Sequence, residues 1–363
     1  MKGRVLVIVA ALVFLGSLAC VLWPAAPAAV QSAEIEPLAA STGVSRNQSR
    51  PFVGIAMQVQ NPGRIPDYLK AIDQIADEGA DTVSLVIASR QENGRSSQIF
   101  IDLRGAPTDE QLSELIAHAK ARKLRVVLMP IVLLENPEGH EWRGTIHADH
   151  WDQWWDSYRE MIGHFAAIAQ KTGVDLFSVG SELVSTEIYS DEWTKTIQMV
   201  RQRYGGLITY SSNWDHYTSV PFWSQLDLMG MNSYWKLGES RAVSVDEIVS
   251  RWHGIQQDLF RFQAKINKPL ILLEAGWCDV ANAAHEPWDY TRVEIPIDLD
   301  LQRKLYSGFF RAWWGVPQMG GFMLWEWTLD GGGPTDRGYT PQGKPAETVM
   351  KDWFAKPRWS VKP

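Results

Sequence analysis

Residues 270–276 read LILLEAG, and two other stretches have the same character, VVLMPIVLL at 126–134 and GFMLWEW at 321–327. Each is an apolar run that lacks the polar alternation of a half-exposed strand. A strand reads this way when both of its faces are buried, as in a parallel sheet covered by helices. These stretches predict buried parallel strands, and one of them carries Glu274 where a core residue is expected.

The chain from residue 51 onward alternates such strands with amphipathic helices. Strands are predicted at 52–58, 82–88, 125–134, 176–180, 207–211, 226–231, 269–275 and 320–325. Helices are predicted at 66–78, 108–123, 149–171, 190–204, 244–266, 298–314 and 345–354. Eight strands that alternate with helices favour an α/β fold of the (β/α)8 TIM-barrel type over an open sheet. No glycine-rich nucleotide-binding fingerprint follows an early strand.

Composition narrows the class of protein further. The chain has 363 residues, of which 45% are hydrophobic and 21% charged, so it is expected to be globular. Its net charge is −7 without a prominent Lys/Arg cluster, which argues against a nucleic-acid partner. Two cysteines exclude a disulfide scaffold. The 18 tryptophans are in excess, and indoles serve either as core packing or as flat surfaces that stack on sugar rings.

Residues 1–23 are predicted to be a signal peptide or an N-terminal membrane anchor. Lys2 and Arg4 precede an uncharged apolar run over 5–23, as in a secretory signal. The run also has about the 18–20 residues that span a bilayer, and Cys20 leaves a lipoprotein as a third alternative. Each alternative places the folded part outside the cytoplasm: secreted, periplasmic or membrane-anchored. Residues 24–50, rich in Ala, Pro and Ser, predict a linker to a domain at 51–357, which a tail at 358–363 follows.

The ends of the predicted strands carry the residues of chemical interest. Active sites of (β/α)8 barrels lie at the C-terminal ends of the strands, on the loops that follow them. The residues at these positions are Arg90, Ser181 and Glu182, Asn213 and Trp214, Asn232 and Tyr234, Glu274 and Trp277, and Trp325, with Trp142 in the loop after the third strand.

Glu182 and Glu274 are the most informative of these residues, because each stands at the end of an apolar strand. Burying an unpaired charge is unfavourable, so each carboxylate needs an ion-pair partner or a function. The functional interpretation is a hydrolytic pair, in which one glutamate protonates the leaving oxygen and the other attacks the anomeric carbon. Retaining glycosidases hold such groups about 5–5.5 Å apart. The fourth and seventh strands are nearly opposite in a small barrel, so long side chains can come that close.

Several stretches around these residues carry a family resemblance. They are VLMP at 127–130, WRG at 142–144, GSEL at 180–183, NSY at 232–234, LEAGW at 273–277 and GKPA at 343–346. Over about residues 52–355 the sequence resembles the clan A retaining glycoside hydrolases. Within the clan it most resembles glycoside hydrolase family 113, a β-mannanase family.

The resemblance implies a role for each matched residue. Glu182 would be the acid/base, Glu274 the nucleophile, and Tyr234 the residue that hydrogen-bonds the nucleophile and keeps it ionised. Trp325 would form the floor under the sugar that is cleaved. The other expected substrate-binding residues are Trp142, Trp214 and Trp277 at neighbouring subsites, Arg90 and Asn213 contacting sugar hydroxyls or supporting Glu274, and Asn232 and Ser181.

Ser181 departs from the pattern of the clan. Many clan A enzymes place Asn before the acid/base glutamate, where its amide binds the sugar 2-hydroxyl. The hydroxyl of Ser181 is shorter, so this contact is expected to be weaker or to be made by another group. The departure bears on substrate choice, since the 2-hydroxyl configuration separates mannose from glucose, but it leaves the carboxylate pair in place.

Other polar clusters are interpreted as solvated loops. The histidines of 140–150 lack the helical spacing of a metal site, and the glycine-rich 330–336 lacks the order of a calcium loop. No metal and no cofactor are predicted. Glu326 is expected to point away from the barrel lumen, because neighbouring strand residues alternate between faces.

The sequence thus predicts an exported, monomeric retaining glycoside hydrolase that acts on a β-linked polysaccharide or oligosaccharide, with β-mannan as the first choice. A β-glucanase or β-galactanase on the same barrel is one alternative. A non-catalytic carbohydrate-binding barrel of the cell envelope is another.

Overall fold

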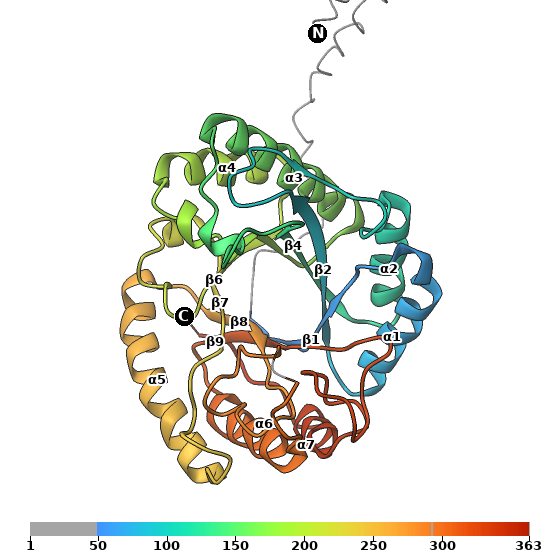
Figure 1. The fold of residues 1–363 in the computed structure, drawn as a ribbon, viewed down its shortest axis with the longest axis vertical. Helices are drawn as coiled ribbons and strands as arrows, with labels where there is room; N and C mark the ends of the chain where they lie inside the picture. Colours follow the sequence, from blue (N-terminus) through green and yellow to red (C-terminus); the bar gives the residue numbers. More distant parts are fainter. Residues whose placement is uncertain (1–48, 292, 363) are drawn as a thin grey trace, which may run out of the picture. The chain divides into compact units, whose positions relative to one another are not determined.

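Eight parallel strands close into a ring in the computed structural model, which describes residues 49–291 and 293–362 (Figure 1). The strands are β1 (Phe52–Gln58), β2 (Thr82–Gln91), β4 (Arg125–Leu134), β5 (Leu176–Ser181), β6 (Leu207–Ser212), β7 (Met229–Asn232), β8 (Leu270–Ala275) and β9 (Met319–Leu324). β1 pairs with β2 on one side and with β9 on the other, which closes the ring. The short β3 (Ile99–Phe100) pairs antiparallel with the end of β2. The predicted (β/α)8 barrel is confirmed.

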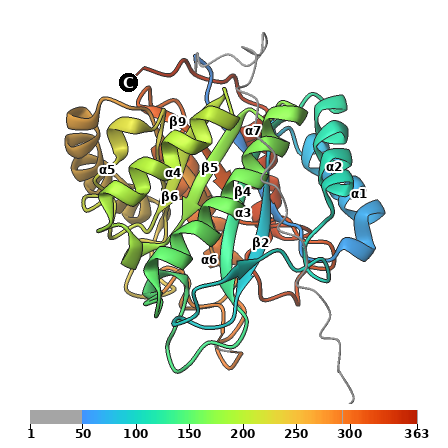
Figure 2. The ribbon, with the colours of Figure 1, turned by 90° about the horizontal axis from the view of Figure 1, so that it is seen from above.

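Helices surround the ring, and α3 and α4 lie in front of the strands in the side view (Figure 2). Within the described residues they are α1 (Ile65–Asp77), α2 (Asp109–Ala121), α3 (Trp151–Thr172), α4 (Ser190–Arg203), α5 (Val245–Ile266), α6 (Leu299–Trp313) and α7 (Pro345–Phe354). A short 3-10 turn, Trp223–Gln225, takes the place of an α-helix between β6 and β7. Capping boxes at Thr108 and Ser244 fix the starts of α2 and α5, as side chains that bind free backbone N–H groups do.

The core has two layers, because strand residues alternate between the barrel interior and the helices. On β4, Val127 and Met129 belong to the inner cluster, whereas Val126 and Leu128 pack in the outer one. Several indoles are fully buried in the outer layer, among them Trp154, Trp155, Trp193, Trp252 and Trp313. The tryptophan excess therefore reflects core packing to a large extent.

Two barrel strands contain a bulge close to the glutamates. β5 has one residue more than β6 between their pairings at Ser178 and Ser181, just before Glu182. β8 has one residue more than β7 between Leu272 and Glu274. A bulge leaves one residue unpaired and re-aims the side chains near it. The bulge in β8 thus takes Glu274 out of the regular alternation of its strand.

Only a part of the two predicted end segments can be compared with the structure. The predicted signal or anchor segment at 1–23, and residues 24–48 of the predicted linker, lie outside the described residues. Among those that are described, no helix is long and apolar enough to cross a membrane. The predicted tail packs on the barrel: Trp359 Nε1 donates to the Met319 carbonyl at 3.0 Å, and Arg358 Nε lies 3.1 Å from an Asp81 carboxylate oxygen.

Candidate active site

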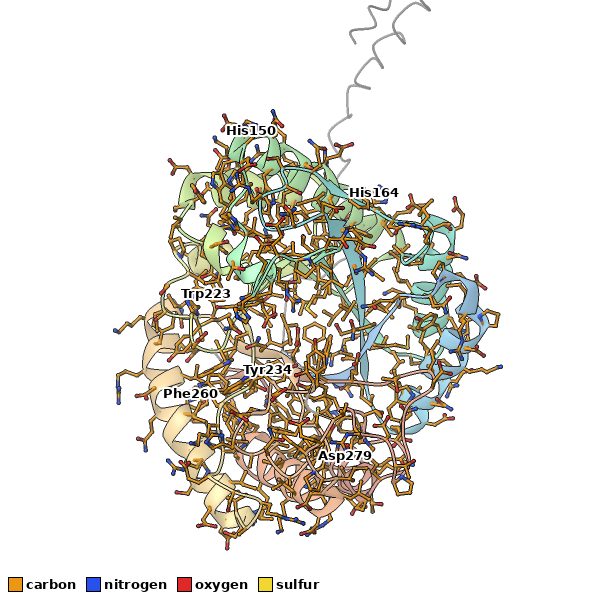
Figure 3. The ribbon with its side chains drawn as sticks, viewed as in Figure 1. His150, His164, Trp223, Tyr234, Phe260 and Asp279 are labelled. Carbon is orange, nitrogen blue, oxygen red and sulfur yellow. The ribbon has the colours of Figure 1, made fainter. Side chains whose placement is uncertain are left out.

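The C-terminal ends of the strands surround a cleft of about 1280 Å³. Seven residues that the sequence singled out line it: Glu182, Glu274, Tyr234, Trp325, Trp142, Asn213 and Trp214. Figure 3 shows Tyr234 inside the ring, on the side of β7 and β8. Side chains that are up to 183 residues apart in the chain (Trp142 to Trp325) thus face one cavity.

Glu182 follows β5, and both of its carboxylate oxygens are occupied by donors. Asn232 Nδ2 donates to Oε1, and the guanidinium of Arg143 forms an ion pair with Oε2. The backbone of Glu182 is left-handed, with φ 53°, and its N–H donates to the Ser211 carbonyl at 2.7 Å. Such a φ is unfavourable for a residue with a Cβ, and it recurs at functional sites.

Glu274 lies in β8 and is held through one oxygen only. The hydroxyl of Tyr234 donates to Oε2 at 2.8 Å. Oε1 is buried and accepts no hydrogen bond from the residues that the structure describes. Leu273 belongs to the inner cluster, so strict alternation would turn Glu274 outward. The bulge instead turns its carboxylate into the cleft.

The charge of Glu182 affects the pKa of Glu274. Burial and the neighbouring Glu182 raise the pKa of Glu274 to about 8, against the opposing effects of Arg143 and Tyr234. Burial disfavours the charged form of Arg143, but Glu182 and Glu274 outweigh it and raise the pKa of Arg143. Burial and Glu274 also raise the pKa of Tyr234 well above its ordinary value, so its hydroxyl stays a donor. Because of the raised pKa of Glu274, the pair of carboxyl groups keeps one proton up to a pH of about 8.

Asn232 connects the two glutamates from behind the cleft. It is the register partner of Glu274 across β7 and β8, and its side chain donates to Glu182. The same amide donates to Asn213 Oδ1 at 2.9 Å and accepts from the Trp214 N–H at 2.7 Å. Asn232 is fully buried and lies outside the cleft lining, so the structure makes it a support of Glu182 where sugar contact was expected.

Three further predicted residues do not face the cleft. Trp277 is 0% exposed and packs against Trp252 and Tyr306, so the expectation that it flanks a subsite is corrected. Ser181 is buried, and Arg90 lies with its Nε 3.5 Å from Glu135, neither of them in the lining. Trp277 does not reach the cleft because it follows β8 at a place where its ring packs against α5 and α6.

Several cleft residues were missed or misplaced by the sequence analysis, and four of them are described here. Glu326 was expected to point outward but lines the cleft, because β9 ends at Leu324 and strand alternation stops there. Arg143, Trp288 and Tyr290 were given no role, yet they line the same cleft. Trp288 stacks on Trp214 with ring centroids 6.1 Å apart. For Trp288 and Tyr290, the aromatic residues in the long 276–298 connection after β8 are the sequence signal that could have indicated them.

The polar side chains of the loop at 140–150 contact a neighbouring loop of the protein. Glu141 Oε2 accepts from the Gly94 N–H at 2.9 Å, and Asp149 pairs with Arg95 at 2.8 Å. Across the described parts of the chain, no group of three or more His, Cys, Asp or Glu side chains is arranged to hold a metal ion.

The contact between Tyr234 and Glu274 leads to the first prediction. Tyr234→Phe removes the only described hydrogen bond to the Glu274 carboxylate, and this bond favours the charged form. We expect kcat/KM to fall about 10-fold, the effect of one hydrogen bond to a charged group, and the pKa of Glu274 to rise. The pH profile of kcat/KM checks the prediction, with Tyr339→Phe as the matched control, since the Tyr339 hydroxyl donates to the Pro287 carbonyl and not to a carboxylate. An equal loss in both variants would contradict it.

Coupled carboxyl groups set among aromatic rings are the means by which glycosidic bonds are hydrolysed. A (β/α)8 barrel that carries such a pair after its fourth strand, β5, and within its seventh, β8, is therefore a glycoside hydrolase of the clan A fold. The particular family follows from comparison with known proteins: the model of Glycoside Hydrolase Family 113 matches residues 66–344, and the chain belongs to this family.

Solved structures agree with this assignment. A GH113 β-1,4-mannanase is 25% identical, with a TM-score of 0.77 over 85% of this chain and 100% of that one. The GH113 β-mannanase AaManA from Alicyclobacillus acidocaldarius, in complex with ManMIm, is 28% identical, with a TM-score of 0.75 over 84% and 97%. A GH5_18 variant from Streptomyces cattleya, at 15% identity and a TM-score of 0.57 over 86% and 83%, shares the fold. A search of curated proteins found no match.

Proposed function

We propose that this protein hydrolyses β-mannan, or oligosaccharides derived from it, with retention of anomeric configuration. The single observation that carries the mechanism is the asymmetry at Glu274. Tyr234 holds Oε2, whereas the buried Oε1 accepts no hydrogen bond from described residues, and Glu274 lines the cleft. An oxygen with a free lone pair and a fixed partner is suited to attack carbon.

The first step forms a glycosyl-enzyme. Glu274 Oε1 bonds to the anomeric carbon while the bond from that carbon to the leaving oxygen breaks, and Glu182 gives its proton to this oxygen. The proton shared by the pair must lie on Glu182 for this step. The positive charge that develops at the anomeric carbon favours ionised Glu274, so it favours this arrangement.

The second step reverses these roles. Glu182, now ionised, takes a proton from a water molecule, whose oxygen bonds to the anomeric carbon. The bond to Glu274 breaks, and its carboxylate is restored. Two inversions leave the product in the β configuration. Arg143 and Asn232 both contact Glu182, and they stabilise the ionised form that this step requires.

Mannan is supported as the substrate by the two solved GH113 structures, both of which are β-mannanases. The cleft is lined by Trp142 and by the stacked Trp214 and Trp288, whose flat rings can stack on sugars. The apolar run at 5–23 supports export, because it follows Lys2 and Arg4 as in a secretory signal. The proposed place of action is therefore outside the cytoplasm.

The test uses the full chain with 2,4-dinitrophenyl β-mannoside, β-glucoside and β-galactoside, with mannooligosaccharides and with β-mannan. We expect β-mannosides to react fastest and NMR to show the β-anomer of the product first. Release of the α-anomer would overturn retention. Preference for a glucoside or galactoside would overturn the assignment of mannan as the substrate. Binding of mannooligosaccharides without hydrolysis would favour a binding protein.

The shared proton gives a pH prediction. Because the pKa of Glu274 is raised to about 8, the free enzyme keeps one proton on the pair up to that pH, and the first step needs it. We expect kcat/KM for mannooligosaccharides to be lost as pH rises through about 8. The 2,4-dinitrophenyl glycosides, whose leaving group hardly needs an acid, serve as the control and should fall less. An equal fall for both substrates would contradict this assignment.

A further inference from the structure

A third carboxylate, Glu326, faces the cleft and takes no part in the two steps above. It follows Trp325 after the end of β9, and both residues line the cavity. Gln58 Nε2 donates to Glu326 Oε2 at 2.8 Å, and Gln60 Nε2 donates to Gln58 Oε1 at 2.6 Å. The two amides form a chain that fixes the orientation of the carboxylate and leaves Oε1 without a described donor.

Within residues 49–291 and 293–362, no cation forms an ion pair with Glu326. Other carboxylates of the cleft have partners: Arg64 binds Asp330, and Lys344 Nζ lies 2.6 Å from Asp336. Glu326 has only the neutral amide of Gln58 in the described chain, and burial raises its pKa to about 7. An oriented, half-buried carboxylate without a counter-ion is unfavourable by itself, which indicates that a ligand supplies the missing donor.

We propose that Glu326 is a substrate-binding residue that accepts hydrogen bonds from ring hydroxyls of the sugar lying on Trp325, and that it helps to set which hydroxyl configuration this subsite takes. The proposal rests on the proposed function. The chemistry fits, because one carboxylate can accept from hydroxyls on neighbouring carbons.

The experiment combines removal of the carboxylate with removal of sugar hydroxyls. kcat/KM is measured for the wild type and for Glu326→Ala and Glu326→Gln with the best 2,4-dinitrophenyl β-glycoside and with its 3-, 4- and 6-monodeoxy forms. We expect the wild type to lose about 10- to 100-fold for one of the deoxy sugars, the effect of one hydrogen bond to a charged group. Glu326→Ala should lose a similar factor with the parent glycoside and almost nothing more with that deoxy sugar.

Glu78→Gln is the matched control. Glu78 is another buried glutamate whose pKa is raised to about 7, but it binds Lys351 at 3.1 Å and caps α1, away from the cleft lining. The variant Glu78→Gln should lose the same factor in kcat/KM with each deoxy sugar as the wild type does. The proposal would be overturned if, for every deoxy sugar, Glu326→Ala lost as much from removal of the hydroxyl as the wild type does.

A separate measurement distinguishes this proposal from the proposed function. The Kd of mannotriose is measured by titration calorimetry for the wild type, Glu326→Ala and Glu78→Gln. If the wild type binds but does not hydrolyse, the hydrolytic function fails, and a Kd raised about 10-fold or more in Glu326→Ala alone still supports the sugar contact. An unchanged Kd in Glu326→Ala, or no binding of mannotriose by the wild type, would overturn it.

Discussion

Glu274→Ala should abolish hydrolysis of both mannan and 2,4-dinitrophenyl glycosides, with a fall in kcat of about 10⁵-fold or more. The variant lacks the oxygen that bonds to the anomeric carbon, so a good leaving group does not help it. Azide added to the variant should take the vacated place below the ring. Because it attacks directly, with one inversion, the product expected by NMR is the α-glycosyl azide.

The variant is expected to fold. The pKa of Glu274 is raised from 4.5 to about 8 in the folded state, so the folded protein binds more protons than the unfolded chain between these values. Stability is then lost as pH rises from about 4.5 to 8, and replacing the group removes this loss. Thermal unfolding at pH 7 should show a Tm at least equal to that of the wild type. A folded variant with normal turnover would overturn the assignment of the nucleophile.

Glu182→Ala has the second-largest expected effect, and the effect depends on the leaving group. With 2,4-dinitrophenyl glycosides the first step needs little acid, whereas the second step lacks its base. We expect kcat to fall about 10²- to 10⁴-fold and KM to fall with it, because the glycosyl-enzyme accumulates. Azide needs no base, so it should restore turnover and give the β-glycosyl azide. Mannan hydrolysis should be lost in both the presence and the absence of azide.

Glu182→Gln is the companion variant, since alanine leaves the Arg143 guanidinium without its ion-pair partner. Removing one member of a buried pair destabilises a protein by about 3–5 kcal/mol. Glutamine keeps the size of the side chain and one carbonyl acceptor, which can accept from Arg143 or from Asn232, but it lacks the acid. The same kinetic pattern in both variants ties the effect to proton transfer. Formation of the α-azide by either variant would exchange the roles of Glu182 and Glu274.

Much of the barrel was predictable because its information is local. The first strand, Phe52–Gln58, and the third, Arg125–Leu134, have the predicted bounds, since an apolar run between turn residues marks its own limits. β7 begins at Met229, three residues later than expected. Leu226 and Leu228 are buried like strand residues. The backbone of this segment is bonded differently from that of β7: the Leu226 N–H donates to the Trp223 carbonyl and the Asp227 N–H to the Ile208 carbonyl. Hydrophobicity reports burial, and it does not report which backbone partner is used.

The site was predictable for residues that end a strand and less so for those in loops. Glu182, Glu274 and Tyr234 were expected to lie together, and they line one cleft, because strand order alone brings strand ends together. Trp277 and Trp288 show the limit: both follow β8, yet one is fully buried and the other is 47% exposed in the cleft. Neither periodicity nor composition distinguishes two indoles in one loop, because their directions depend on contacts with α5, α6 and Trp214.

The sequence by itself determined the eight-stranded barrel and the presence of a glutamate at the ends of its fourth and seventh strands. Apolar runs and their order contain that information, and no long-range detail is needed. The tertiary structure alone decided what surrounds the carboxylates. The bulge in β8 turns Glu274 inward, Arg143 reaches Glu182 from another loop, and Glu326 enters the cleft where β9 has ended. These contacts join residues far apart in the chain, and only the closed barrel brings them together.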